Sequence, residues 1–217
     1  MKSIKKYIRT ILNVTLNLLS SFIPSMKIIL ETKKSQTPVR FKMLFIQKII
    51  GFNKSAYWPV HHSSIVSNVK NIIIGVDTSP GFMGGCYIQG RGGIKIGDYT
   101  QISCNVGIIS ENHSVYDCRA HIKNKKEISV TIGKYCWIGM NSVILPNIEL
   151  GDFTIVGAGS VVTKSFSEGF CVIAGNPAKV IKKLDKKDCV FYENDIEYCG
   201  FIKKASFEKF RVKELDI

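Results

Sequence analysis

An aliphatic residue recurs every six positions on both sides of an interruption in the middle of the chain. These positions are Ile96, Ile102, Ile108, Ile132, Ile138, Ile144, Leu150, Val156 and Val162. Helices and flat sheets have side-chain periods of 3.6 and 2, so neither explains a period of six. A fixed hexapeptide repeat is typical of a β-helix, in which each short strand turns a corner and stacks on the coil below. The repeat therefore predicts an all-β solenoid of parallel strands.

Glycine often follows the aliphatic residue of the repeat, as in Ile132-Gly133 and Leu150-Gly151. The aliphatic side chain would fill the core, and glycine would leave the backbone free at a tight corner. Three sixes complete one triangular coil, so Gly133 and Gly151 are expected to lie one coil apart. The stretch from Asn71 to Val76 is expected to form an earlier coil.

The repeat is interrupted between Ser110 and Ser129 by a polar, charged segment that lacks the six-residue period. An insertion between two coils in register must project as a loop, and functional residues concentrate on such loops. The loop, residues 111–128, holds His113 and His121, two of only four histidines in the chain. We expect it to be functional, although a tolerated surface insertion is the alternative.

Charge is unevenly distributed along the chain. Residues 1–60 carry eleven Lys and Arg against the single Glu31, which is +10 of the total +13. Residues 61–170 carry nine basic against eight acidic residues, so the repeat region is almost neutral. This argues against a nucleic-acid partner, because such a partner needs a basic stripe on the folded domain itself. Seven cysteines, an odd number without paired CxxC motifs, predict buried thiols in a reducing, cytoplasmic compartment.

Three regions are therefore expected: a basic amphipathic N-terminal helical region over residues 1–60, the β-helix over residues 61–184, and a C-terminal extension over residues 185–217. The N-terminal helix would dock on protein, or lie on the inner face of an anionic membrane as a peripheral contact. Polar residues interrupt its apolar face, which argues against a secretory signal and against a spanning helix. The aromatic-rich extension is expected to pack along the β-helix or on a neighbouring subunit.

Four ordered motifs resemble the left-handed β-helix acyltransferases with hexapeptide repeats, in particular their sugar and polysaccharide O-acetyltransferases. The motifs are Asn112-His113-Ser114, Ile132-Gly133-Lys134-Tyr135-Cys136-Trp137-Ile138-Gly139, Val156-Gly157-Ala158-Gly159-Ser160-Val161-Val162-Thr163-Lys164 and Ala174-Gly175-Asn176-Pro177-Ala178-Lys179-Val180-Ile181. The resemblance covers roughly residues 70–184. It implies a left-handed parallel β-helix, a homotrimer with active sites between adjacent subunits, and acetyl transfer from acetyl-CoA to a carbohydrate acceptor during polysaccharide biosynthesis.

The resemblance places the catalytic histidine at His113. Moving an acetyl group from a thioester to a sugar hydroxyl requires a base, and histidine has the side-chain pKa closest to neutral pH. Glu111 or Asp117, or a backbone carbonyl, would orient its ring. A backbone N–H near Gly139 would stabilise the oxyanion. No covalent acyl-enzyme is needed, so we expect direct transfer.

The resemblance also implies a donor site on the last coils. The pantetheine arm of coenzyme A would pass Gly139 and Ala158, and Trp137 would pack at the thioester end. Phosphates would meet basic or polar residues near the end of the β-helix. These residues are Thr163, Lys164, Lys179 and Lys182. Met140 is larger than the residue often found at its position, which leaves the donor contacts there open.

Other interpretations remain. The acceptor could be serine or an amino sugar, or the chain could be a non-catalytic β-helix scaffold that does not bind coenzyme A. His61, His62 and His121 have no role that the sequence decides. No metal is expected, because two loop histidines eight positions apart do not match a zinc-site spacing.

Overall fold

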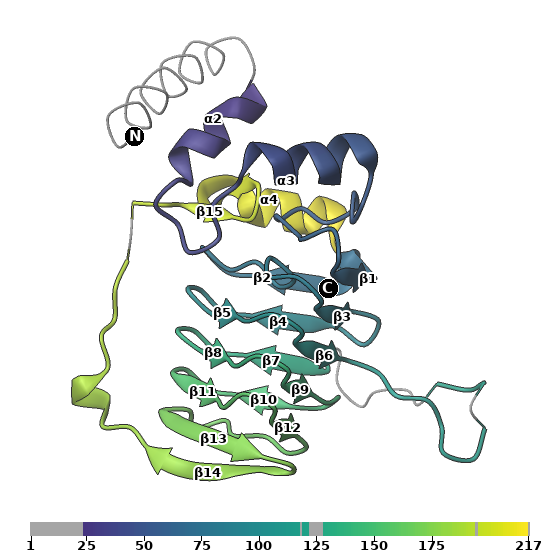
Figure 1. Ribbon diagram of the computed structural model, residues 1–217, viewed down its shortest axis with the longest axis vertical. Coiled ribbons are helices and arrows are strands. Elements are labelled where there is room, and N and C mark those ends of the chain that lie inside the picture. The colour runs from purple at the N-terminus through teal and green to yellow at the C-terminus, as the bar shows by residue number, and fades with distance from the viewer. Residues whose placement is uncertain (1–23, 118, 122–127, 194, 217) are drawn as a thin grey trace, which may run out of the picture.

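The computed structural model describes residues 24–117, 119–121, 128–193 and 195–216. The expected helix within residues 1–23 lies outside this range. Within it, three parallel sheets form the sides of a left-handed β-helix (Figure 1). The first side contains β1 (Ile65–Ser67), β3 (Tyr87–Gln89), β6 (Gly107–Ile109), β9 (Val143–Ile144) and β12 (Val161–Val162). The second contains β2 (Ile72–Ile74), β4 (Ile94–Ile96), β7 (Val130–Ile132) and β10 (Glu149–Leu150).

The third side consists of β5 (Gln101–Ile102), β8 (Trp137–Ile138) and β11 (Thr154–Val156), followed by β13 (Cys171–Gly175) and β14 (Ala178–Lys183). All its pairings are parallel except the last, where β14 turns back antiparallel to β13. The antiparallel hairpin ends the stack at the lower end of the β-helix (Figure 1).

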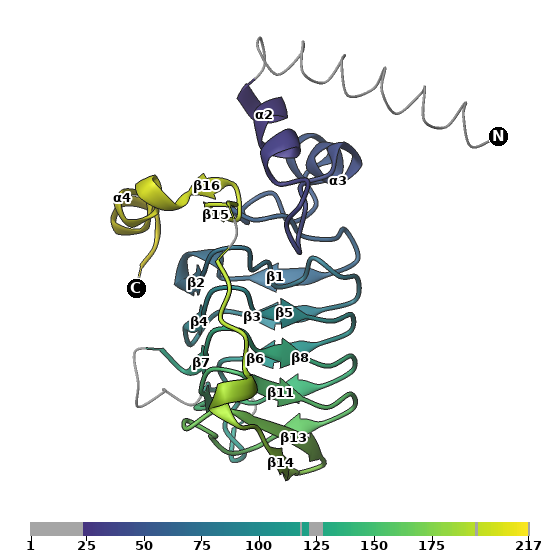
Figure 2. The ribbon, with the colours of Figure 1, turned by 90° about the vertical axis from the view of Figure 1, so that its left-hand side faces the viewer.

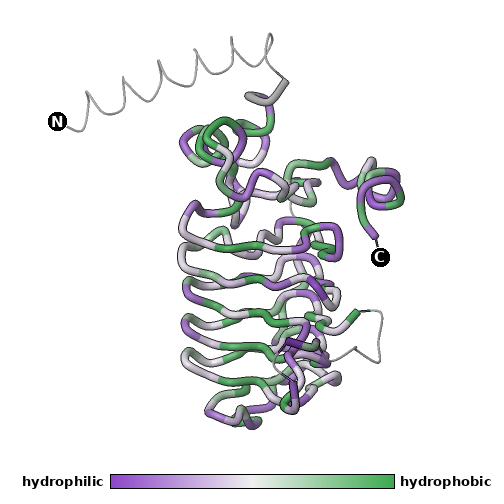
Figure 3. The backbone as a smooth tube through the Cα atoms, turned by 90° about the vertical axis from the view of Figure 1, so that its right-hand side faces the viewer, coloured by the Kyte–Doolittle hydropathy of each residue, from purple (hydrophilic) through white to green (hydrophobic). Residues whose placement is uncertain are grey.

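The hexapeptide period places one aliphatic side chain from each strand in the core. Ile96 and Ile132 pair in register, as do Ile102 and Ile138, and all nine repeat positions are buried. Figure 3 shows the resulting apolar segments stacked from coil to coil. Stacked aliphatic side chains remove a continuous core from water, which is what holds a solenoid together. The predicted fold is confirmed.

One corner of the β-helix carries a row of aromatic residues, which we call the aromatic ladder: Tyr99, Tyr135, Phe153 and Phe170. All four have left-handed backbones, with φ between +47° and +57°. Each ring stacks on the next, with centroids 4.8–5.4 Å apart. This conformation costs about 1–2 kcal/mol for an ordinary residue, so the ring stacking offsets a local strain.

Helices cover the upper end of the β-helix, above β1 and β2 (Figure 1). They are α2 (Pro24–Glu31), α3 (Phe41–Phe45), the π-helix η1 (Ile46–Ile50) and α4 (Lys204–Glu214); the 3-10 turns are η2 (Val69–Asn71) and η3 (Lys186–Asp188). Gln47 joins η1 to the first coil: its buried amide donates to the carbonyls of Ala56 and Trp58, and its Oε1 accepts from the Val60 N–H. No helix in the described ranges is long and apolar enough to span a membrane.

The C-terminal extension returns along the outside of the β-helix from β14 to the upper end (Figure 2). There it forms the hairpin β15 (Tyr198–Cys199) and β16 (Ile202–Lys203) before α4. On its way, Phe191 and Tyr192 contact the aromatic ladder. The extension therefore packs along its own β-helix, one of the two arrangements expected.

Candidate active site

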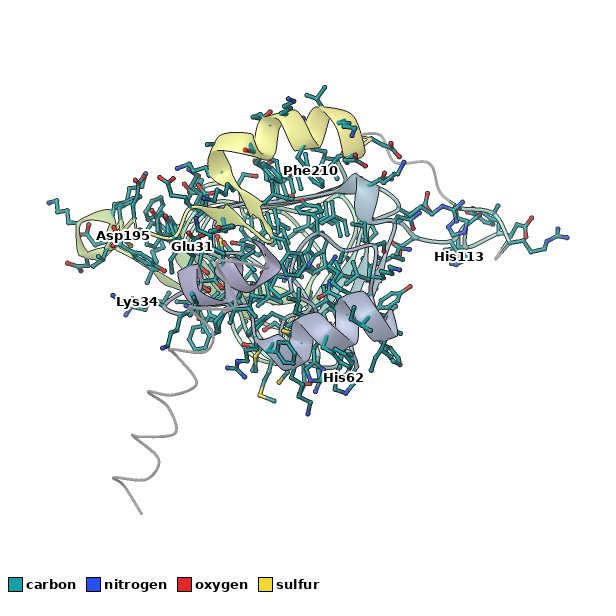
Figure 4. The ribbon with its side chains drawn as sticks, turned by 90° about the horizontal axis from the view of Figure 1, so that it is seen from above. Glu31, Lys34, His62, His113, Asp195 and Phe210 are labelled. Carbon is teal, nitrogen blue, oxygen red and sulfur yellow. The ribbon has the colours of Figure 1, made fainter. Side chains whose placement is uncertain are left out.

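The loop between β6 and β7 projects from one side of the β-helix (Figure 1). His113 and His121 pair as an antiparallel β-bridge, and the Ser114 N–H donates to the Ala120 carbonyl at 2.7 Å. This local pairing brings the two imidazole rings together, with centroids 4.3 Å apart and planes at 37°. The His113 side chain is exposed on this projecting loop (Figure 4).

His121 lies in a polar cluster at the base of the loop. Arg91 donates from a terminal guanidinium nitrogen to His121 Nε2 at 2.8 Å. Because arginine can only donate, Nε2 must be the unprotonated nitrogen, and Nδ1 carries the proton. His121 Nδ1 lies 3.0 Å from Glu111 Oε2, and Arg91 Nε lies 3.0 Å from the same oxygen. Neither Nδ1 nor Oε2 makes a well-aligned hydrogen bond within the described residues, so these contacts are electrostatic.

Both carboxylates that could orient His113 have other partners. Glu111 faces Arg91 and His121, and Asp117 Oδ1 accepts from Arg119 Nε at 3.0 Å. Arg119 lowers the pKa of the Asp117 carboxyl by hydrogen bonding from its side chain and backbone. The His113 ring lies instead against the ring of His121.

A groove of about 570 Å³ runs along the outer face of β5, β8 and β11. It brings together three of the residues predicted to contact the donor: Trp137, Gly139 and Ala158. Trp137 is 53% exposed, and its indole N–H donates to Ser103 Oγ at 3.3 Å. An added Cβ at Gly139 would lie 2.6 Å from the Val156 carbonyl oxygen, so glycine here lets the next coil approach closely. Met140 also lines the groove.

The remaining predicted donor residues lie outside the groove lining, towards the lower end of the β-helix. Outward side chains of the third side form one row through the strand pairings Gln101–Trp137, Trp137–Ile155, Ile155–Val172 and Val172–Lys182. Lys182 therefore ends the row that holds Trp137, three strand spacings away, or roughly 14 Å. Lys179 pairs with Ala174, and Thr163 and Lys164 are exposed just after β12.

The backbone N–H of Gly139 itself is not free to stabilise an oxyanion. The Gly139 N–H donates to the Val156 carbonyl at 2.8 Å, within the coil ladder. That N–H is thus already used, and a backbone donor in this region must come from another residue.

Gln36 and Thr37 form the upper wall of the groove, which no sequence pattern had indicated. Asp77, a buried corner residue with φ +50°, accepts from the backbone N–H groups of both, at 3.0 and 3.4 Å. The Gln101 amide also donates to the Gln36 side chain. These contacts join segments 40 to 65 residues apart, which no local pattern reveals.

The described residues contain no group of three or more His, Cys, Asp or Glu placed to hold a metal ion. The catalytic candidate and the groove lie on different sides of the chain: the loop is on the right of Figure 1, and β5, β8 and β11 are on the left. His113 is not among the residues that line the groove.

Comparison with known proteins agrees with this architecture. The family described as "Bacterial transferase hexapeptide (six repeats)" matches residues 129–164. A galactoside acetyltransferase solved in complex with coenzyme A is 29% identical, with a TM-score of 0.52, over 64% of this chain and 67% of its own.

Two further solved structures are similar to this chain. A maltose O-acetyltransferase from Clostridium difficile 630 has 24% identity and a TM-score of 0.49, over 72% of this chain and 83% of its own. A hexapeptide-repeat acetyltransferase from Vibrio cholerae O1 biovar eltor, complexed with acetyl coenzyme A, has 19% identity and a TM-score of 0.46, over 72% and 84%. No curated protein matches this chain. The chain is thus a left-handed β-helix of hexapeptide repeats that resembles the acyltransferases of this fold, and the family match and the likeness to galactoside acetyltransferase support that resemblance.

Proposed function

We propose that this protein transfers the acetyl group of acetyl-CoA to a hydroxyl of a carbohydrate. The observation that carries the proposal is the groove on the third side, where Trp137, Gly139 and Ala158 come together. Its small floor residues leave room for the pantetheine arm, and Lys182 ends the same row, where it can meet a phosphate. The similar galactoside acetyltransferase was solved with coenzyme A bound.

His113 is the general base of this proposal. Its unprotonated nitrogen takes the proton of the acceptor hydroxyl as that oxygen attacks the thioester carbonyl. The carbon–sulfur bond then breaks, and the proton passes from the imidazolium to the departing thiolate. The His121 ring lies beside the His113 ring, with centroids 4.3 Å apart, on the same projecting loop.

The active site of this proposal lies between two subunits of a homotrimer. Within one chain, the loop and the groove are on different sides of the β-helix (Figure 1). A projecting loop can reach the groove of an adjacent copy, so that one subunit supplies His113 and its neighbour supplies the donor groove. The acceptor is a sugar, a polysaccharide or a lipid-linked glycan.

Thiol release from acetyl-CoA, measured over a panel of sugars and glycans, tests the proposal. His113→Ala should lower acceptor-dependent release by roughly 10²–10⁴-fold, the usual contribution of a general base. Tyr116→Ala is the matched control, because Tyr116 lies in the same loop and is 97% exposed. Calorimetry with coenzyme A should give equal affinities for the parent and both variants.

Different outcomes select the alternatives. Release that depends on serine or an amino sugar would identify the other acceptor class. A folded protein that neither binds coenzyme A nor releases thiol would favour the non-catalytic scaffold. Full activity in His113→Ala would remove this residue from the mechanism.

A further inference from the structure

A second cavity, of about 440 Å³, lies at the upper end of the β-helix between α3 and the loop that carries His61 and His62. Four basic side chains line it: Arg40, Lys42, His61 and His62. Its apolar wall is formed by Met43, Ile46, Val60, Phe82 and Met83. The view from above places His62 away from the His113 loop (Figure 4). This cavity is therefore separate from the catalytic candidate of the same chain.

Among the residues that the structure describes, no counter-charge lies beside the basic groups of this cavity. No carboxylate lines it, and in the described part of the chain neither Arg40 nor Lys42 forms an ion pair. The His61 and His62 rings lie against each other, with centroids 4.2 Å apart. Burial lowers the pKa of His61, and the neighbouring His62 and Lys42 lower it further. Four cationic or proton-donating groups line one cavity, and a bound anion would interact favourably with all of them through charge and hydrogen bonds.

The geometry also fixes which nitrogen of His61 can donate. The Ser63 N–H donates to His61 Nδ1 at 3.2 Å. Nδ1 is therefore an acceptor, and neutral His61 carries its proton on Nε2. Because Nδ1 faces Ser63, Nε2 is the nitrogen left to donate to a ligand in the cavity.

The cavity adjoins the donor groove. Phe82 and Met83 line both, so they form the shared wall between the two hollows. A molecule in the upper cavity would lie next to the upper part of the groove, beside Gln101 and Ser103. The apolar wall suits the carbon face of a sugar ring, and the basic side suits an acidic substituent.

We propose that this cavity binds the acidic group, a carboxylate or a phosphate, of a negatively charged carbohydrate acceptor. Arg40 and Lys42 supply positive charge, and His61 supplies a hydrogen-bond donor. The inference rests on the proposed acetyl transfer and names its acceptor class. A neutral sugar would leave the basic cluster without a partner, so acidic acceptors should be preferred.

The kinetic test compares matched acceptors: glucuronic acid and glucose 1-phosphate against glucose, with acetyl-CoA as donor. The double variant Arg40→Gln/Lys42→Gln should lower the ratio of kcat/KM for acidic over neutral acceptor by roughly tenfold or more, as expected for lost charge-assisted hydrogen bonds. Lys70→Gln/Lys95→Gln is the control, since it removes the same charge from exposed residues outside this cavity. An unchanged ratio in the Arg40/Lys42 variant would overturn the proposal.

A binding test separates this inference from acetyl transfer itself. Calorimetry should show that the parent binds glucose 1-phosphate or glucuronic acid more tightly than glucose, and that the Arg40/Lys42 variant loses this preference while the control keeps it. Inorganic phosphate alone should bind more weakly than glucose 1-phosphate, because it lacks the ring that meets the apolar wall.

Three further outcomes distinguish failure of the cavity proposal from failure of the proposed acetyl transfer. If the binding preference holds but no acceptor releases thiol, the site stands and the proposed acetyl transfer fails. Equal binding of acidic and neutral sugars by the parent overturns the site. Loss of binding to phosphatidylserine vesicles in the variant, with no binding of acidic sugars by the parent, would assign the basic cluster to a membrane surface.

Discussion

The ring of Phe191 packs edge-on against the ring of Phe153, with centroids 4.8 Å apart and planes at 69°. Phe153 belongs to the aromatic ladder on one corner of the β-helix, and Phe191 lies on the chain that returns from its lower end. Tyr192 continues the contact at Tyr135 and Tyr99. The C-terminal extension thus covers a row of aromatic rings that would otherwise face water.

We expect Phe191→Ala to loosen this extension. Edge-to-face pairs contribute about 0.5–1.5 kcal/mol each, but Phe191 is 61% exposed, so a loss of about 1 kcal/mol in the free energy of unfolding is expected. Limited proteolysis should cut residues 185–193 faster in this variant than in the parent. Val190→Ala is the control, because Val190 is the exposed neighbour of Phe191. Equal cleavage rates in both variants would show that the ring contact does not hold the extension.

The six-residue period predicted the β-helix because every side of a coil repeats the same local structure, in which an inward-facing aliphatic residue is followed by a corner. The aromatic ladder and the return of the extension could not be predicted in the same way. Tyr135 and Phe191 are far apart in sequence, and a tyrosine with φ +55° is unusual for its type. The extension's aromatic residues indicated packing without indicating a partner.

The candidate site also contains residues that the repeat predicts and residues that it does not. Trp137, Gly139 and Ala158 lie within repeats, so their placement along one groove follows from the coil geometry. Gln36 and Thr37 are held at that groove by hydrogen bonds with Asp77 and Gln101, which depend on the folded chain. The basic cavity likewise needs α3 and the first coil to be assembled before its side chains meet.

Asp77 is expected to be a positioning residue for the donor groove. Asp77→Ala removes the acceptor for the Gln36 and Thr37 N–H groups, so the upper wall should loosen. We expect the KM for acetyl-CoA to rise roughly tenfold, with kcat changed less, as for an interaction made equally in ground and transition states. Asp77→Asn keeps one acceptor oxygen and should restore part of the affinity. A fall in kcat alone, at constant KM, would contradict this role.

Gly133 is expected to tolerate no side chain. A Cβ there would lie 2.6 Å from the Asp152 backbone nitrogen and 2.7 Å from the Gly151 carbonyl carbon in the next coil. Gly133→Ala should therefore separate two coils and lower the free energy of unfolding by about 3 kcal/mol, at the upper end of overpacking costs. Gly107→Ala is the matched control, because its Cβ would meet only Val143 side-chain atoms at 3.6 Å or more. Urea denaturation should separate the two variants clearly.

The buried thiol of Cys136 should make stability fall in alkali. Burial is the main cause that raises the pKa of Cys136 to about 12, from an ordinary value of 9.0. Its Sγ also lies 3.3 Å from the Gly151 carbonyl oxygen, which accepts from a thiol but repels a thiolate. Between these two pKa values the unfolded chain loses a proton that the folded chain keeps. The thiol's contribution to stability is thus fully present below pH 9 and is lost as pH rises towards 12.

The free energy of unfolding, measured by urea denaturation with reductant, should therefore decline above pH 9 by up to about 1.4 kcal/mol per pH unit from this group. Cys136→Ala should be less stable at pH 7 but should show a shallower decline. Cys199→Ala should also flatten the profile, since burial raises the pKa of Cys199 to about 12. Parallel profiles for the parent and Cys136→Ala between pH 9 and 10.5 would mean that the thiol ionises in the folded protein as readily as in the unfolded chain.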